Sequence, residues 1–233
     1  MKKIIIFISL ICNVAFSQIS LDRTRVIFDE RDTRSQTVVV SNTNTASPYL
    51  AQTWLEDENG NKISSPLVAL PILQRINPRQ DKPVKITIAG STSVLPQDRE
   101  SLLFFNVLGV PPKDTTVANK VNVVLQSKLK LFYRPAGLPQ YKADEWVKEM
   151  TVRGEGKGFI LHNPTAYHIV IIAFSPVSKN DLVQKDIILK PYGTEKVDIQ
   201  LRNSLRIHFV NDFGGGQSVD YTCSSGNCSI VEK

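Results

Sequence analysis

Short β-strand patterns separated by turn residues run through almost the whole chain and leave little room for helices. Runs rich in Val, Ile, Leu, Tyr and Phe alternate with clusters of Pro, Gly, Asn and Asp, as in all-β proteins. The first series of expected strands is residues 20–28, 35–41, 49–56, 84–88, 101–108 and 119–133. The second series is residues 149–152, 158–162, 168–175, 185–189, 195–199, 204–210 and 217–223. About six or seven strands per series is the number found in an immunoglobulin-like β-sandwich.

The segment RPAGLPQ, residues 134–140, separates the two series and contains the Pro and Gly residues typical of a domain boundary. We therefore expect an all-β protein with two immunoglobulin-like β-sandwich domains, at residues 18–138 and 139–233. Trp54 lies in an expected strand and is predicted to pack in the core of the first domain.

Residues 1–17 have the layout of a secretory signal peptide. Lys2 and Lys3 give a positive start, and residues 4–16 are almost all apolar and end in small residues. This apolar run is shorter than the roughly 20 residues that a helix needs to span a bilayer. We expect cleavage before Gln18 and export to a bacterial periplasm, without membrane insertion.

Two cysteines remain after that cleavage, Cys223 and Cys228 in the sequence YTCSSGNCS. Gly226 and Asn227 lie between them and favour a turn, so the two thiols can join in a disulfide across it. A disulfide fits an oxidising compartment. A loop this short gains only about 2 kcal/mol from the cross-link, which is enough to hold a hairpin but not a domain.

Residues suited to catalysis or metal binding are sparse and scattered. His162, His168 and His208 have no metal-ligand spacing and no nucleophile motif beside them, and we interpret His168 and His208 as packed or surface side chains. The glycines of residues 154–158 lack the Gly-Lys-Ser/Thr ending of a phosphate loop and are better explained by a hairpin turn, and those of residues 214–216 also indicate a turn. We expect no enzyme, no metal site and no cofactor.

The formal net charge is +6 at pH 7. The basic residues are dispersed among acidic ones, and no module combining aromatic and basic residues stands out. This distribution argues against binding to nucleic acid.

The expected strand at residues 119–133 carries an uncharged stripe, Val121, Val123 and Leu125, with Lys130 further along. Lysines often protect the open edge of a sheet, whereas an uncharged stripe invites pairing with another strand. Taken alone, Lys130 is better explained as edge protection than as an anion ligand.

Several stretches of the chain resemble the periplasmic chaperones of the chaperone–usher pilus pathway, in the order found in that family. They are ISLDRTRVIFD at residues 19–29, SPYLAQTWLED at residues 47–57, LPQDRESLLFFNVLGVPP at residues 95–112, KLKLFYRP at residues 128–135 and VNDFGG at residues 210–215. The short connection at residues 113–116 resembles the short-loop branch of the family. The resemblance implies two immunoglobulin-like domains in a boomerang, with an edge strand that completes a pilus subunit by donor-strand complementation.

The resemblance also implies roles for single residues. Val121, Val123 and Leu125 would fill the pockets of the subunit groove, and Arg25 and Lys130 would bind the subunit's C-terminal carboxylate. In a regular strand Lys130 is out of phase with the stripe, so we expect a bulge or a strong twist between them.

A second implied group is the charged network of Glu100, Arg134 and Asp212 between the domains, which would orient the cleft. The implied partners are pilus subunits and the outer-membrane usher, and we expect the free protein to pair with a second copy through its exposed edge. The alternative is a secreted two-domain immunoglobulin-like adhesion or binding module that uses loops at one end of a sandwich.

Overall fold

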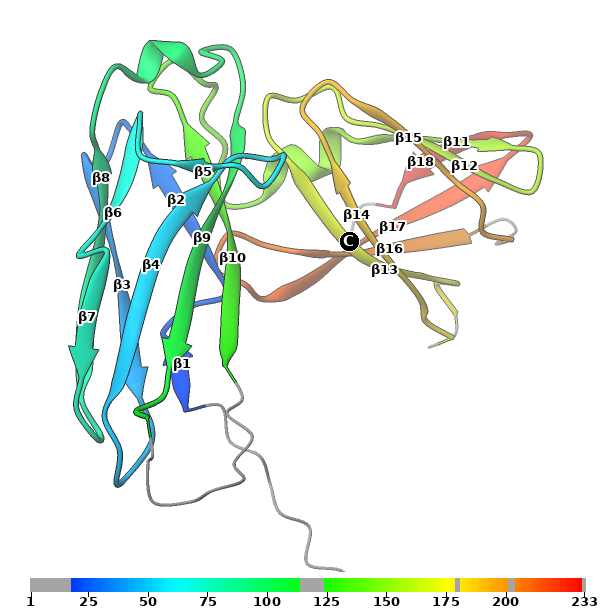
Figure 1. Cartoon of the computed structure of the whole chain (residues 1–233). Coiled ribbons are helices and arrows are strands. Elements are labelled where there is room, and N and C mark those ends of the chain that lie inside the picture. Colours follow the sequence, from blue (N-terminus) through cyan, green and yellow to red (C-terminus); the bar gives the residue numbers. More distant parts are fainter. Residues whose placement is uncertain (1–17, 114–123, 179–180, 201–203, 232–233) are drawn as a thin grey trace, which may run out of the picture.

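The computed structural model describes residues 18–113, 124–178, 181–200 and 204–231. Strands dominate these residues, and the helices among them are two short 3-10 turns, η1 (Thr92–Val94) and η2 (Glu145–Glu149). Two β-built domains meet at an angle and give the molecule the outline of a boomerang (Figure 1). Among the described residues no helix is long and apolar enough to cross a membrane.

The first domain is a sandwich of two sheets. Its strands are β1 (Ile19–Leu21), β2 (Arg25–Asp29), β3 (Ser35–Asn42), β4 (Tyr49–Glu56), β5 (Lys62–Ile63), β6 (Leu67–Leu70), β7 (Leu73–Ile76), β8 (Asp81–Ile88), β9 (Ser101–Val110) and β10 (Leu125–Arg134). One sheet has the order β1-β3-β8-β6, and the other has the order β2-β10-β9-β4-β5, with β7 also paired to β4. The stretch predicted as one strand, residues 20–28, is therefore two strands in different sheets.

Alternate residues of these strands fill the space between the two sheets, as the two-residue period of a strand requires. The buried side chains include Val26, Phe28, Val38, Val40, Val84, Ile86, Leu103, Phe105, Leu131 and Tyr133. On β10 the side chains that alternate with the core residues, Phe132 and Arg134, lie on the opposite face and contact the second domain. The cleft between the two domains therefore lies against the outer face of the sheet that contains β10, and the inner face of that sheet packs in the core of the first domain.

Trp54 lies outside this core, so the prediction of a core tryptophan was wrong. In β4 the inward positions belong to Thr53 and Leu55, and the alternation places Trp54 on the other face. Its indole Nε1 donates a hydrogen bond to Glu56 at 2.6 Å, and the Lys62 ammonium lies 4.4 Å from the centre of its ring.

The second domain is one continuous sheet in the order β14-β13-β16-β17-β18-β11-β12-β15. The strands are β11 (Thr151–Glu155), β12 (Gly158–His162), β13 (Ile169–Ser175), β14 (Val183–Leu189), β15 (Thr194–Val197), β16 (Ser204–Val210), β17 (Gly216–Ser224) and β18 (Asn227–Ile230). Buried residues from distant parts of the sheet, such as Phe159 on β12 and Ile207 on β16, share one core cluster. The sheet therefore folds over on itself to form a sandwich. Leu138, the last residue of the range predicted for the first domain, packs in this second core.

Turn predictions in the second domain are confirmed. Gly156 lies in the turn between β11 and β12, and Gly214 lies in the turn between β16 and β17. Cys223 and Cys228 form a disulfide between β17 and β18, where they are paired directly. The disulfide thus holds a hairpin at the end of the domain.

The close approach of β12 and β15 gives a stability prediction. A Cβ at Gly158 would lie 2.1 Å from the Val197 carbonyl oxygen on β15, so Gly158→Ala must push two paired strands apart. We expect a loss of about 1 to 3 kcal/mol in the free energy of unfolding, measured by urea denaturation. The matched control is Gly154→Ala on β11, where the nearest atom would be at 3.5 Å and the change should stay within about 0.5 kcal/mol. Equal stability of the two variants would contradict this packing.

Candidate functional site

Strand β10 has a partner on both sides along only part of its length. β9 pairs with it from Leu125 to Tyr133, whereas β2 pairs with it, in parallel, only from Lys130 to Arg134. On the β2 side, residues 125–129 therefore have no paired strand within the described part of the chain. Their backbone groups form an open edge (Figure 1).

The apolar side chains at the start of this edge are uncovered. The side chain of Leu125 is 51% exposed and that of the neighbouring Val124 is 46% exposed. Val121 and Val123, the other members of the predicted stripe, lie outside the described residues. Leu125 is therefore the member of the stripe whose surroundings can be read from the structure.

We expected a bulge or a strong twist between the stripe and Lys130, and the bulge is absent between Leu125 and Lys130. The pairing of β10 with β9 is one to one from Leu125 to Tyr133. Regular alternation then places Leu125 on the same face as the core residue Leu131, and Lys130 on the face toward the cleft. Leu125 and Lys130 therefore belong to opposite faces of a strand that is regular between them.

Arg25 and Lys130 are direct neighbours, because they are paired residues of the parallel strands β2 and β10. Arg25 donates one hydrogen bond from Nη1 to the Val210 carbonyl oxygen at 2.9 Å, and its buried Nε has no partner among the described residues. Burial lowers the pKa of Arg25, although a guanidinium remains protonated in proteins. Two cations side by side, one with an unused buried donor, can bind an anion such as a carboxylate.

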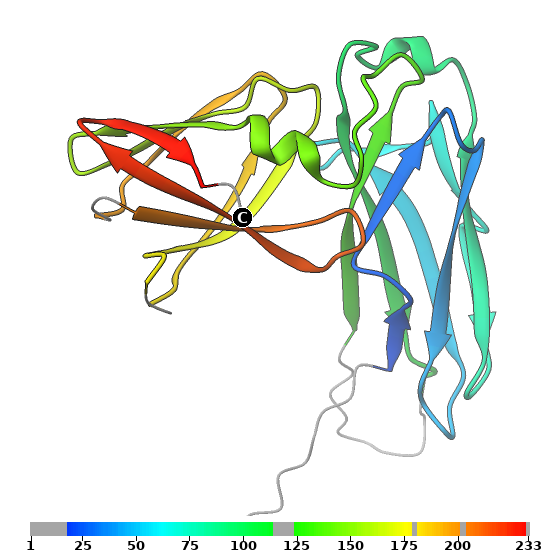
Figure 2. The same cartoon turned by 180° about the vertical axis from the view of Figure 1, so that it is seen from behind.

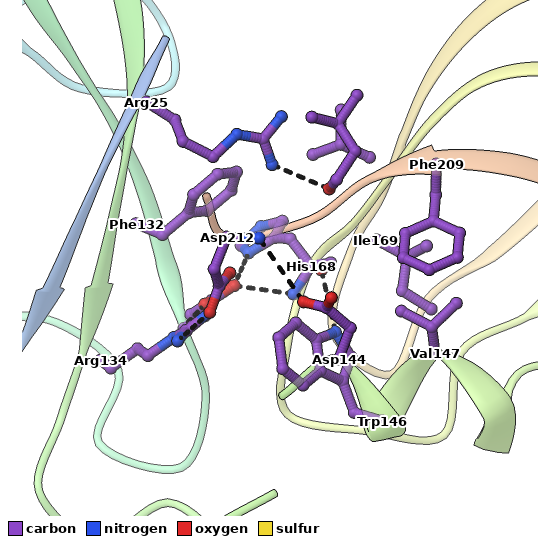
Figure 3. A pocket seen from close by; sticks show the side chains of 13 residues that line it. Arg25, Phe132, Arg134, Asp144, Trp146, Val147, His168, Ile169, Phe209 and Asp212 are labelled. Carbon is purple, nitrogen blue, oxygen red and sulfur yellow. Dashed lines mark hydrogen bonds and ion pairs between the residues drawn. The ribbon is translucent and has the colours of Figure 1, made fainter. Parts of the chain in front are cut away.

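Arg134 connects the two domains at the centre of the cleft (Figure 3). Its Nε donates to Glu100 Oε1 at 2.7 Å, and its Nη1 and Nη2 donate to the two carboxylate oxygens of Asp212 at 2.6 and 2.8 Å. Burial alone would lower the pKa of Arg134, but the charges of Glu100 and Asp212 raise it overall. The structure thus brings together the three residues that we predicted as an interdomain network.

His168 also contacts this network, although no sequence signal indicated it. Its backbone N–H donates to Glu100 Oε2 at 2.7 Å, and its ring Nδ1 lies 2.9 Å from the same oxygen. Burial would raise the pKa of Glu100, but the hydrogen bond from His168 and the charge of Arg134 lower it overall. A lone histidine before a strand says nothing about a carboxylate 68 positions away, so only the fold could reveal this contact.

Further contacts join the domains on both sides of Arg134. Lys190 Nζ lies 2.8 Å from Glu58 Oε2, and the Tyr192 hydroxyl donates to the Asp98 carbonyl oxygen at 3.3 Å. Figure 2 shows the hairpin of β16 and β17 reaching the first domain, where a Cβ on Gly214 would come within 2.3 Å of a Thr24 side chain. These contacts join the domains in addition to the hydrogen bond from Arg25 to Val210. The described residues contain no group of three or more His, Cys, Asp or Glu side chains that could hold a metal ion.

Comparison with known proteins identifies the class that this fold and cleft define. The family model described as "Pili and flagellar-assembly chaperone, PapD N-terminal domain" matches residues 18–139, and "Pili assembly chaperone PapD, C-terminal domain" matches residues 145–221. The chain belongs to this family of periplasmic pilus-assembly chaperones.

Named relatives agree with this assignment. Chaperone protein PmfD of Proteus mirabilis is 36% identical over 229 residues, covering 95% of this chain and 89% of the relative. Chaperone protein PapD of Escherichia coli is 35% identical over 222 residues, covering 94% of this chain and 92% of the relative. The crystal structure of the YadV chaperone has a TM-score of 0.72 and 29% identity, over 89% of this chain and 100% of that one. The SafB chaperone in complex with the SafA pilin of Salmonella enterica has a TM-score of 0.76 at 22% identity, over 90% of this chain and 97% of that one, which shows the shared fold.

The buried position of Glu100 gives a pH-dependent stability prediction. Glu100→Gln leaves Arg134 buried with one carboxylate fewer, at a cost of about 3 to 5 kcal/mol at pH 7. Because the pKa of Glu100 is lowered in the folded protein, its contribution is present above the ordinary carboxyl pKa of about 4.3 and is lost as the pH falls through the folded value. Urea denaturation should therefore show a full difference from wild type at pH 7 that shrinks below about pH 4.

The control is Glu58→Gln, which removes the exposed pair with Lys190 and should cost about 0 to 1 kcal/mol at any of these pH values. Equal losses in the two variants would mean that the buried position of Glu100 has no energetic consequence.

Proposed function

We propose that this protein captures pilus subunits in the periplasm through the open edge of β10 and hands them to the outer-membrane usher. One observation carries the proposal. β2 begins at Arg25, which is paired with Lys130, and the unpaired part of β10 lies directly before that point. Arg25 and Lys130 therefore lie at the end of the unpaired stretch of β10.

This arrangement sets the direction of the captured strand. An extended segment placed beside residues 125–129 would occupy the position along β10 that β2 does not reach. If its terminal carboxylate lies on Arg25 and Lys130, the segment runs in the same direction as β10. The captured strand is thus parallel to β10, as β2 is, and the carboxylate sets its register.

The side chains of the stripe would fill the open core of the subunit while the backbone of β10 completes its sheet. Burial of Val121, Val123 and Leu125 contributes about 1.5 to 3 kcal/mol each, and each backbone hydrogen bond contributes about 0.5 to 1.5 kcal/mol net. Association costs about 4 to 15 kcal/mol, which is similar to this gain, so capture is clearly favourable only when it is coupled to folding of the subunit. Release then requires that the strand of a neighbouring subunit replaces β10, and ATP is not needed.

The comparisons support the choice of partner. The named relatives are chaperones, a further relative, YfcS of Escherichia coli, is named a probable fimbrial chaperone, and one structural neighbour was solved in complex with a pilin. Residues 1–17, with the pattern of a secretory signal, support export to the periplasm. Delivery to the usher and capping of the free edge by a second copy of the chain are inferred from the family and from the exposed edge alone.

The first test of capture addresses the stripe. Leu125→Asp places a carboxylate in an apolar pocket of the subunit and should abolish co-purification of a co-expressed pilus subunit. The free chaperone should stay folded by circular dichroism, because the side chain of Leu125 is 51% exposed.

The matched control is Val124→Asp, which adds the same charge at a similarly exposed residue directly before β10, one position out of phase with Leu125. This variant should retain the subunit. Loss of the subunit from both variants, or from neither, would mean that the face bearing Leu125 does not enter the groove.

The second test addresses the anchor. A peptide copied from the last strand of a subunit should bind the wild type more tightly with a free C-terminal carboxylate than with an amidated end. Arg25→Ala and Lys130→Ala should each remove most of this difference, because an under-paired buried carboxylate costs about 2 to 5 kcal/mol. Isothermal titration calorimetry gives the affinities, and the double variant should not distinguish the two peptides.

Equal binding of the acid and amide peptides by the wild type would overturn the carboxylate anchor. An adhesion module that binds through its loops would be insensitive both to amidation and to Leu125→Asp.

A further inference from the structure

Glu100 is held from both domains at once. One carboxylate oxygen, Oε1, accepts from Arg134 of the first domain at 2.7 Å. The other, Oε2, accepts from the backbone N–H of His168, which belongs to the second domain, and lies within 2.9 Å of its ring. Arg134 also bonds Asp212 of the second domain, so Glu100 and Arg134, which are bonded to each other, each contact the second domain as well.

The contact with Glu100 determines which ring nitrogen of His168 carries a proton. Glu100 is buried with a lowered pKa, so it is ionised at neutral pH and its oxygens can only accept hydrogen bonds. Nδ1 must therefore donate, and the Nδ1–H form of the imidazole is required. The backbone at His168 accepts a further hydrogen bond, from the indole N–H of Trp146 to the His168 carbonyl oxygen at 3.4 Å.

The other side of the ring contacts the wall of the subunit cleft. The imidazole of His168 lies against Phe132 of β10, with 5.4 Å between the ring centroids. The guanidinium of Arg25 lies 6.0 Å from the centroid of the same Phe132 ring. His168, Phe132 and Arg25 thus form a continuous series from the second domain to the cation pair (Figure 3).

Charged groups reach this region from every neighbouring element. Arg25 comes from β2, Arg134 from β10, Asp144 from the segment before η2 and Asp212 from the turn after β16, and together with Glu100 they line one narrow pocket. Three carboxylates therefore face two guanidinium groups. A donor supplied by His168 satisfies the oxygen of Glu100 that neither arginine reaches.

We propose that His168 is a positioning residue: its Nδ1–H bond to Glu100 fixes the angle between the domains and so the place of Arg25 in the cleft. The effect on the subunit rests on the proposed function, whereas the effect on the interdomain angle does not. Two variants separate the hydrogen-bond donor of the His168 side chain from its aromatic ring. His168→Phe keeps a ring against Phe132 but has no donor, and His168→Asn has an amide nitrogen in the place of Nδ1 but no ring.

Interdomain geometry can be measured in the free, full-length mature protein by electron paramagnetic resonance. Spin labels at Asn59→Cys and Lys157→Cys, which are exposed positions in the two domains, report the distance between them. Cys223 and Cys228 are joined to each other and should not take up label. We expect a narrow distance distribution in the His168 protein, a broad or shifted one in His168→Phe, and recovery in His168→Asn. An unchanged distribution in His168→Phe, or no recovery in His168→Asn, would overturn the proposal.

A second measurement does not depend on any variant. In the wild type, the long-range ¹H–¹⁵N spectrum of the His168 ring should show a protonated Nδ1 at neutral pH, and a ring protonated only on Nε2 would overturn the proposal. This measurement also decides the matter if His168→Phe does not fold.

The consequence for binding is tested with the acid and amide peptides. His168→Phe should weaken binding of the acid peptide on the order of tenfold, as expected when one hydrogen bond to a charged group is lost, and should leave the amide peptide unaffected. If the wild type binds neither peptide, the proposed capture mechanism fails, while the label distances still decide the role of His168.

Discussion

The hydrogen bonds of the Arg134 guanidinium are the interactions on which the arrangement of the two domains around the cleft depends. The guanidinium is almost entirely buried between the domains and reaches Glu100 of its own domain and Asp212 of the other with three hydrogen bonds. A planar guanidinium with donors in fixed directions can make such contacts only if the two carboxylates are correctly placed. The guanidinium also lies over the aromatic rings of Trp146 and Tyr167, which belong to the second domain as well. Directional bonds therefore connect the two domains at this point, and we propose that this buried ion pair serves their geometry more than their stability.

The angle between the two domains matters because residues of one strand, β10, both line the cleft between the domains and form the open edge. The last residues of β10 carry Arg134, the middle carries Lys130 beside Arg25, and the first residues carry the exposed Leu125. A shift of the second domain changes the environment of Arg25, since its hydrogen bond goes to Val210 of that domain. An exposed apolar edge is normally a hazard for a secreted protein. In a pilus chaperone the same edge is the proposed binding surface, and the cation pair beside it restricts which strands can occupy it.

Much of the fold was predictable because strand patterns are local. The bounds of β4, β12 and β16 match the predicted ranges, and the disulfide follows from two cysteines flanking a turn. Short strands such as β5 and β18 were missed, since two to four residues carry little periodicity. The predicted core position of Trp54 failed because an aromatic residue on a strand can face either side of the sheet.

The sequence by itself determined the class of the protein, its two-domain all-β architecture and the residues that form the charged network. Motifs and strand patterns involve residues close together in the chain, so they can be recognised without the structure. The sequence could not determine the phase of β10, which is regular between Leu125 and Lys130 because pairing with β9 allows no extra residue. Nor could it reveal that β2 begins only at Arg25 and leaves an open edge beside the first residues of β10, or that His168 contacts Glu100. Those features depend on contacts between residues far apart in the chain, and only the packing of the two domains decides which of them meet.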